Sequence, residues 1–221
     1  MPGMMDTVLN IGLNDTTVKG LAKSTGNERF AYDSYRRLLD MFGDVVLGIP
    51  HEDFECKFDK VKEAANAESD VDLGVEELKK LCQEYKQVYD EHGMKFPSDP
   101  HEQLEACIKA VFGSWMTPRA VKYREKENIR GLLGTATNIQ TMVFGNMGDS
   151  SGTGVAFSRN PSTGEPKMYG EYLINAQGED VVAGIRTPQP IQQMQEVLPK
   201  AYEQFLKNVD LLEHYFKGKL S

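Results

Sequence analysis

In residues 134–157, GTATNIQTMVFGNMGDSSGTGVAF, a helical pattern gives way to a β-rich one, and this change determines the expected fold class. Residues 135–144 are rich in β-branched side chains and partly alternate between polar and apolar, which is typical of a strand. Glycine, serine and asparagine fill residues 145–152 and predict a turn, and residues 153–159 predict a second strand. We therefore expect an α+β protein whose β-rich part follows its helical part.

Upstream of residue 130, apolar residues recur with the period of a helix. The predicted helices span residues 27–42, 51–67 and 74–92, with a fourth from a cap at Ser98 or Asp99 through Trp115 and a fifth from Pro118 to about Asn128. Asn27 is expected to cap the first helix and Gly43 to end it. The acidic residues 68–72 predict a solvated turn.

Downstream of residue 159, turn residues and β patterns continue to alternate. Residues 160–164 predict a turn, and residues 167–175 and 181–186 predict two further strands. Pro188 and Pro190 then precede a long amphipathic closing helix.

Composition bounds the function. The chain has 221 residues, a net charge of -8 and 40% hydrophobic residues, so it can form a core but offers no basic face to nucleic acid. We expect no membrane partner, because no apolar run approaches the roughly 20 residues that cross a bilayer, and the first residues do not form a signal peptide. The three cysteines, which are widely spaced, are expected to be reduced thiols, and neither they nor the four histidines have metal-site spacing.

Two segments could bind a nucleotide. The loop at residues 1–7 could cradle phosphate through the amides around Gly3, with Thr7 adding a hydroxyl, but a frayed chain end explains the same residues better. Residues 140–144 could offer an adenine ring a donor, an acceptor and an apolar slot, and an ordinary buried strand is again the simpler interpretation.

Three further features each allow a functional and an ordinary interpretation. Glu179 and Asp180 lie beside a glycine and could hold Mg²⁺ or form a solvated turn. Arg159 and Arg186 could face an anion or lie on the surface. The glycines of residues 145–154 lie between two predicted strands, which fits neither a Rossmann nor a Walker loop.

Taken together, residues 1–7, 134–146, 151–164 and 170–188 resemble the nucleotide-binding part of the pyruvate, phosphate dikinase family. The resemblance implies an incomplete ATP-grasp-like module, with a mainly helical subdomain followed by an antiparallel β-rich lobe. It implies transfer of a phosphoryl group from ATP to a histidine on another domain. The overall reaction of the family converts ATP, phosphate and pyruvate to AMP, diphosphate and phosphoenolpyruvate.

The resemblance also assigns segments and residues. Residues 1–14 would be the phosphate-loop segment, residues 15–100 the helical subdomain, and residues 101–221 the β-rich lobe with its closing helix. The residues over the ATP phosphates would be Gly3, Met4, Asp6 and Thr7. The residues bordering adenine would be Gln140, Met142 and Val143.

The family's phosphate-binding lysine and arginine and its metal carboxylates match no position of this sequence, so we assign no catalytic or metal residue. We expect an internal or truncated piece that is nearly inactive alone. The parent would use Mg²⁺ and ATP, act with phosphohistidine and pyruvate-binding domains, form a homodimer, and reside in the cytoplasm or an organelle such as a chloroplast or glycosome.

Two alternatives stay open. One is a module of the phosphoenolpyruvate synthase type, although residues 175–180 fit the dikinase better. The other is a truncated fragment without activity that binds a nucleotide or a partner.

Overall fold

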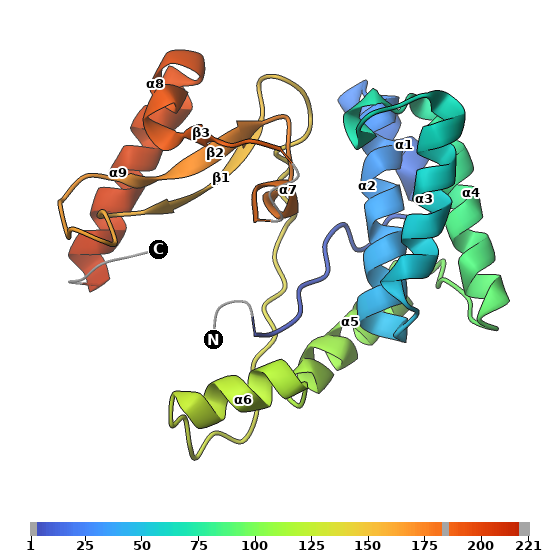
Figure 1. The fold of residues 1–221 in the computed structure, drawn as a ribbon, viewed down its shortest axis with the longest axis horizontal. Helices are drawn as coiled ribbons and strands as arrows, with labels where there is room; N and C mark the ends of the chain where they lie inside the picture. Colours follow the sequence, from blue (N-terminus) through green and yellow to red (C-terminus); the bar gives the residue numbers. More distant parts are fainter. Residues whose placement is uncertain (1–3, 183–185, 217–221) are drawn as a thin grey trace. The chain divides into compact units, whose positions relative to one another are not determined.

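The computed structural model describes residues 4–182 and 186–216 (Figure 1). The chain divides into two compact units, Met1–Met142 and Val143–Ser221. Helices combine with one small antiparallel sheet, in agreement with the α+β class expected from the sequence. None of the described helices has the length and apolar content that crossing a membrane requires.

The first unit is helical. Its elements are α1 (Thr17–Thr25), α2 (Glu28–Met41), the π-helical turn η1 (Phe42–Val46), α3 (His51–Ala65), the 3₁₀ turn η2 (Asp70–Asp72), α4 (Val75–Glu91), α5 (Pro100–Ser114) and α6 (Pro118–Lys126). Helix α2 packs against both α1 and α4, and α3 packs against α4. The five predicted helices are confirmed, whereas α1 was not predicted.

Local chemistry starts two of these helices as the sequence predicted. The side chain of Asn27 accepts a hydrogen bond from the backbone N–H of Phe30, 3.0 Å away, at the start of α2. Asp99 accepts from the backbone N–H of His101 at 2.9 Å at the start of α5. Both bonds satisfy amides that the first helical turn leaves without an internal partner.

The predicted end of α2 at Gly43 is wrong, because the π-helical turn η1 continues through it. Gly43 is buried, and a Cβ built on it would lie 2.3 Å from Cζ of Phe54 on α3. The glycine therefore permits η1 and α3 to approach closely. Phe54 in turn packs edge-on against Tyr85 and Tyr89 of α4, with ring centroids 5.1 and 5.8 Å apart.

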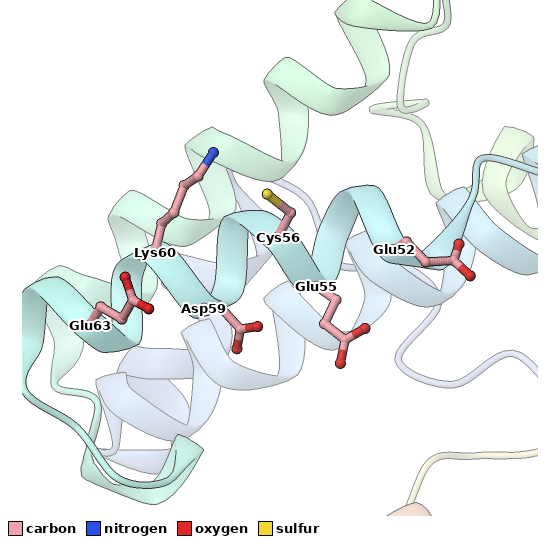
Figure 2. A pocket seen from close by; sticks show the side chains of 6 residues that line it. All are labelled: Glu52, Glu55, Cys56, Asp59, Lys60 and Glu63. Atoms are coloured by element: carbon pink, nitrogen blue, oxygen red, sulfur yellow. The ribbon is translucent and has the colours of Figure 1, made fainter.

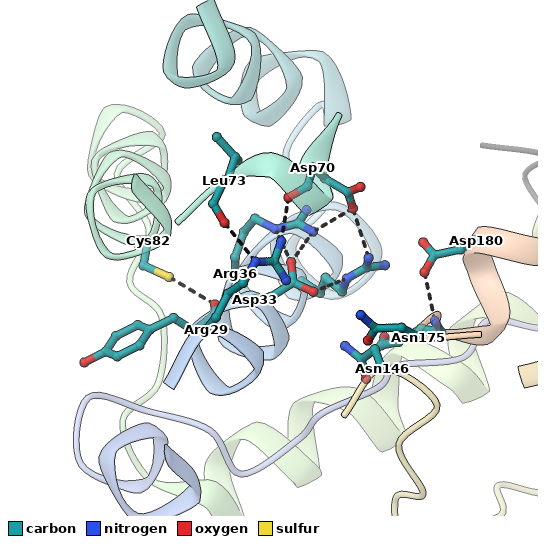
Figure 3. A network of polar contacts seen from close by, with 12 residues as sticks. Arg29, Asp33, Arg36, Asp70, Leu73, Cys82, Asn146, Asn175 and Asp180 are labelled. Carbon is teal, nitrogen blue, oxygen red and sulfur yellow. Dashed lines mark hydrogen bonds and ion pairs between the residues drawn. The ribbon is translucent and has the colours of Figure 1, made fainter. Parts of the chain in front are cut away.

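The predicted solvated turn at residues 68–72 is confirmed in part, because Glu68, Val71 and Asp72 are exposed whereas Asp70 is half-buried. Asp70 accepts a hydrogen bond from Arg29 through its backbone oxygen at 2.7 Å and one from Arg37 through its carboxylate at 3.1 Å. Arg36 and Arg37 also form ion pairs with the buried carboxylate of Asp33 (Figure 3). Asp70 therefore attaches this turn to arginines of α2.

The predicted strand at residues 135–144 does not form in this structure, where the segment is extended and belongs to no sheet of the described chain (Figure 1). Ile139 and Val143 expose 61% and 85% of their surface. A strand is defined by hydrogen bonds to a neighbouring strand, and composition alone cannot supply that neighbour.

The second unit contains the sheet. Its elements are β1 (Gly152–Phe157), β2 (Tyr169–Ile174), α7 (Gly178–Val182), β3 (Gln189–Pro190), η3 (Ile191–Gln193), α8 (Met194–Val197) and α9 (Pro199–Phe216). The three strands are antiparallel in the order β1-β2-β3, with Gly152 opposite Ile174 and Phe157 opposite Tyr169. The strands predicted at residues 153–159 and 167–175 are confirmed.

The strand predicted at residues 181–186 is wrong where the structure describes it, because residues 178–182 form α7 and residues 183–185 lie outside the described part. The carboxylate of Asp180 accepts a hydrogen bond from the backbone N–H of Gln177 at 2.8 Å, which closes a helical turn.

The closing helix is confirmed but interrupted. Helix α8 ends before Leu198, and α9 begins at Pro199. Buried residues of the sheet side, Met168, Tyr172 and Ile191, form a small core to which α9 contributes Tyr202, Phe205 and Val209.

Candidate functional site

The predicted phosphate-loop residues lie at the start of the first unit. Gly3 lies outside the described residues. Met4 and Asp6 are half-buried, whereas Thr7 is exposed. The exposed hydroxyl of Thr7 is free to meet a ligand, but the two half-buried residues contact the protein itself.

The corner between α5 and α6 holds this segment. The Oγ atom of Ser114, at the end of α5, accepts a hydrogen bond from the backbone N–H of Asp6 at 3.1 Å. The Nε–H of Arg119, on α6, donates to the backbone oxygen of Met4 at 3.3 Å, and the same guanidinium forms an ion pair with the carboxylate of Asp6. One serine and one arginine thus fix both the backbone and the charge of this short segment.

The chain that follows is anchored by a buried amide. Gln103 on α5 is fully buried; its Oε1 accepts from the backbone N–H of Gly12 at 2.8 Å, and its Nε2 donates to the backbone oxygens of Leu13 and Pro97 at 3.0 and 2.8 Å. All three bonds go to backbone groups, so Gln103 fixes the path of the chain and not a particular side chain. Residues 4–13 are therefore tied to α5 at both ends.

The predicted adenine-bordering residues lie on the extended segment. Gln140 is exposed, and its Oε1 accepts a hydrogen bond from the side-chain amide of Asn138 at 3.0 Å. Met142 is half-buried and ends the first unit, and the exposed Val143 begins the second. In the described part of the chain no hydrogen bond joins Gln140 or Met142 to the Met4–Thr7 segment.

The backbone of this extended segment is chemically available. Within residues 4–182 and 186–216, no backbone hydrogen bond engages residues 140–143. Unpaired N–H and C=O groups on an extended chain can bind the donor–acceptor edge of a purine or the edge of another strand. The sequence allowed both an adenine-binding segment and an ordinary strand here, and the available backbone groups are compatible with either.

Two loops of the second unit are interlocked. The backbone oxygen of Gly145 accepts from the N–H of Ala176 at 2.9 Å, and a Cβ on Gly145 would lie 2.3 Å from the backbone oxygen of Ala176. The side chain of Gln177 donates to Asn146 at 3.3 Å.

The carboxylate of Asp180 already has a structural partner. Asp180 is buried, and it accepts a hydrogen bond from the backbone N–H of Gln177 at the start of α7 (dashed in Figure 3). Nothing is described of the side chain of Glu179.

The two arginines that could have faced an anion are bound within their own unit. Arg159 donates to the carboxylate of Glu213 on α9, and this hydrogen bond lowers the pKa of Glu213. Arg186 donates to the backbone oxygen of Asn175 at 2.8 Å. Each cation has an internal partner, so neither is a free anion receptor in this arrangement.

A surface hollow on α3 is a different kind of site. Its six lining residues are all exposed and lie along this one helix (Figure 2): Glu52, Glu55, Cys56, Asp59, Lys60 and Glu63. Four carboxylates against one lysine make the hollow acidic, which disfavours a triphosphate. None of the predicted site residues lines it.

Sequence reasoning missed Ser114 and Arg119, which hold the Met4–Thr7 segment, and Gln103, which holds the chain at Gly12 and Leu13. The chain carried only a weak signal for Arg119, which follows Pro118 in the first turn of a predicted helix. Asp6 and Arg119 are separated by 113 positions, and no local pattern links them.

Comparison with known proteins gives one consistent result. Residues 1–210 match the family model described as pyruvate phosphate dikinase, AMP/ATP-binding domain. The chain is 62% identical over 221 residues to pyruvate, phosphate dikinase 1, chloroplastic, of Arabidopsis thaliana and 60% identical to the chloroplastic enzyme of Mesembryanthemum crystallinum. It is 58% identical over 218 residues to pyruvate, phosphate dikinase 2 of Zea mays.

The matched region is a minor part of each relative. The alignments with the Arabidopsis and Mesembryanthemum proteins cover 100% of this chain and only 23% of each relative. The alignment with the maize protein covers 98% of this chain and only 25% of that relative. The similarity therefore concerns one region of these longer relatives.

Proposed function

Because this chain belongs to the family of the pyruvate phosphate dikinase AMP/ATP-binding domain, we propose that it forms the core of the ATP-binding module of a pyruvate, phosphate dikinase. The observation that carries the proposal is identity of 62% along the whole chain with one such enzyme. The full reaction would convert ATP, phosphate and pyruvate to AMP, diphosphate and phosphoenolpyruvate. The resemblance to the dikinase family expected from the sequence is confirmed, and it favours the dikinase over the synthase alternative.

In this proposal the chain is an incomplete ATP-grasp-like module, with a mainly helical subdomain followed by an antiparallel β-rich lobe. Residues 1–14 would supply the phosphate-loop segment, residues 15–100 the helical subdomain, and residues 101–221 the β-rich lobe. One helical unit and one sheet-bearing unit support a module of two parts, with the boundary of the units at Met142 and Val143 and not at residue 100. The extended segment 135–144 would become a strand of the module when a neighbouring strand pairs with it.

The ligand roles follow the same division. Gly3, Met4, Asp6 and Thr7 would form the loop over the phosphates, and Gln140, Met142 and Val143 would border adenine. Support comes from the exposed hydroxyl of Thr7 and from the available backbone groups of the extended segment. Phosphoryl transfer depends chiefly on positioning and charge neutralisation, so these residues would hold and orient ATP.

Mg²⁺ would accompany ATP and neutralise phosphate charge. The described residues contain no group of three or more histidine, cysteine, aspartate or glutamate side chains that could hold a metal ion. They therefore do not fit a protein-built Mg²⁺ site, and we assign no step to the ion.

The remaining parts of the enzyme would be partners of this module. A phosphohistidine domain would accept the phosphoryl group, a pyruvate-binding domain would use it, and the parent would be a homodimer. The Arabidopsis relative carries "chloroplastic" in its name, so an organelle is the proposed location, with the cytoplasm as the alternative.

A chimera tests the proposal. The 221 aligned residues of the Arabidopsis relative would be replaced by this chain, and formation of AMP and diphosphate would be measured with and without pyruvate and phosphate. We expect AMP formation that depends on both. Dependence on pyruvate alone would instead indicate synthase chemistry.

The exchange of phosphoenolpyruvate for pyruvate serves as an internal control, because it does not require ATP. A chimera that retains this exchange but forms no AMP would refute the proposed nucleotide role. The unmodified Arabidopsis enzyme provides the reference rate.

A further inference from the structure

We propose that Arg119 and Ser114 are positioning residues that set the Met4–Thr7 segment for the phosphates of ATP, an inference that rests on the proposed function. Arg119 lies on α6 and Ser114 ends α5, so both belong to the corner where these helices meet. Neither residue was a candidate from the sequence. Their role is to act through the segment and not to touch the nucleotide.

The contacts fix the segment at three points. Ser114 accepts from the N–H of Asp6 at 3.1 Å, Arg119 donates to the oxygen of Met4 at 3.3 Å, and the guanidinium of Arg119 pairs with the carboxylate of Asp6. Ser114 is buried, and its own hydroxyl donates to the backbone oxygen of Val111 at 2.7 Å, which leaves its oxygen lone pairs directed at Asp6. A planar guanidinium that serves a carbonyl and a carboxylate at once is a geometry that lysine cannot reproduce.

The contacts of Ser114 and Arg119 with the segment, here called the clamp, also neutralise the charge of Asp6. A carboxylate in a loop that approaches a triphosphate would repel it. The ion pair with Arg119 neutralises this carboxylate, and only 17% of the Asp6 side chain is exposed. Asp6 is therefore an anchor, and Thr7 and the loop amides are left to face the phosphates.

The corner itself is braced. The guanidinium of Arg124 lies 3.8 Å from the ring centre of Trp115, and its Nη1 donates to the backbone oxygen of Trp115 at 2.7 Å. The hydroxyl of Thr117 donates to the backbone oxygen of Ser114 at 2.8 Å. These contacts keep the turn between α5 and α6 rigid, so that Ser114 and Arg119 meet the segment as one unit.

The experiment compares Arg119→Met with Lys122→Met in the 221-residue chain. Both substitutions remove one positive charge from α6, but Lys122 is exposed and has no contact with the segment among the described residues. Affinity for ATP and for adenosine is measured by NMR titration, which also detects weak binding. We expect Arg119→Met to lower ATP affinity at least tenfold with adenosine affinity unchanged, and Lys122→Met to change neither.

Amide hydrogen exchange of residues 4–7 gives an independent readout. Arg119→Met should deprotect the Asp6 amide, and Arg119→Lys should restore only part of the protection. The exchanged pair Asp6→Arg with Arg119→Asp should recover ATP affinity relative to either single substitution, because it rebuilds the ion pair.

The outcomes separate the two proposals. If the unsubstituted chain binds neither ATP nor adenosine, this inference is overturned, whereas the proposed function is judged separately by AMP formation in the chimera. If the chain binds ATP and Arg119→Met deprotects Asp6 without changing the ratio of ATP to adenosine affinity, the clamp is only structural and the inference is overturned. An unchanged exchange rate at Asp6 would refute the clamp itself.

Discussion

The Oδ1 atom of Asp33 lies 2.6 Å from Nη2 of Arg36, and both side chains are buried on the same helix, α2. The other carboxylate oxygen of Asp33 lies 3.1 Å from Nε of Arg37, whose guanidinium reaches on to Asp70. Arg29 adds hydrogen bonds to the backbone oxygens of Asp70 and Leu73 at 2.7 and 2.8 Å (Figure 3). The cluster therefore fastens the connection between α3 and α4 onto α2.

Replacing Asp33 by asparagine should strongly destabilise the first unit. The substitution removes the nearest carboxylate from the buried guanidinium of Arg36, which keeps only the more distant Asp70 at 3.7 Å. Removing one member of a buried pair typically costs about 3–5 kcal/mol. We expect the free energy of unfolding to fall by about this amount. Urea unfolding followed by the fluorescence of Trp115, the single tryptophan of the chain, measures it.

A matched control is Glu105→Gln, which breaks the exposed pair with Lys109 on α5. Exposed helical pairs contribute little because water screens them. The control should leave the unfolding midpoint nearly unchanged. If both variants unfold at the same urea concentration as the original chain, the Asp33 cluster does not stabilise the fold.

Acid should weaken the same cluster. Burial alone would raise the pKa of Asp33, but the charges of Arg36 and Arg37 outweigh it and lower the pKa from 3.8 to about 2. Because the folded pKa lies below the unfolded value, the stabilisation is fully present above about pH 4 and is lost as the pH falls towards 2. The difference in unfolding free energy between the original chain and Asp33→Asn should shrink over this interval. A constant difference would contradict the assignment.

His51 should give the opposite pH dependence. Its Nδ1 lies 3.0 Å from Oδ1 of Asp40. Burial lowers the pKa of His51, but the charge and hydrogen bond of Asp40 outweigh it and raise the pKa above 6.5. The stabilisation is therefore complete below pH 6.5 and is lost as the pH rises through the folded pKa.

In His51→Gln this loss of stability above pH 6.5 should disappear, and unfolding curves recorded at several pH values measure it. His101→Gln, at the exposed start of α5, is the control and should keep the slope of the original chain. Equal slopes in all three proteins would exclude His51 as the titrating group.

The helices could be predicted from the sequence because their signals are local. Apolar spacing located α2, α3, α4 and α5. Asn27 caps α2 and Asp99 caps α5, as expected. The π-helical turn at Gly43 could not be predicted, because it depends on the approach of Phe54 from another helix. Likewise, the acidic run around Asp70 is indistinguishable from a solvated turn until the arginines of α2 are placed.

The site was predictable only in part, for the same reason. The motifs identified the family, but pairing with a neighbouring strand decides whether residues 135–144 form a strand, and no described strand pairs with them. Asp180 closed a helical turn where β-branched residues suggested a strand. The Arg119–Asp6 pair joins residues 113 positions apart, a separation that a single sequence does not connect.

Gly43→Ala tests the close packing of η1 on α3. A Cβ at this position would lie 2.3 and 2.7 Å from two ring atoms of Phe54, which is fully buried and cannot move away freely. Overpacking of this kind typically costs about 1–3 kcal/mol, so the free energy of unfolding should fall by that amount. Gly20→Ala in α1 is the matched control, because its Cβ meets nothing within 4 Å. That substitution should stabilise the chain by about 0.5–1 kcal/mol through helix propensity. Opposite shifts of the urea midpoint are therefore expected, and a stabilising Gly43→Ala would mean that η1 and α3 are not in contact.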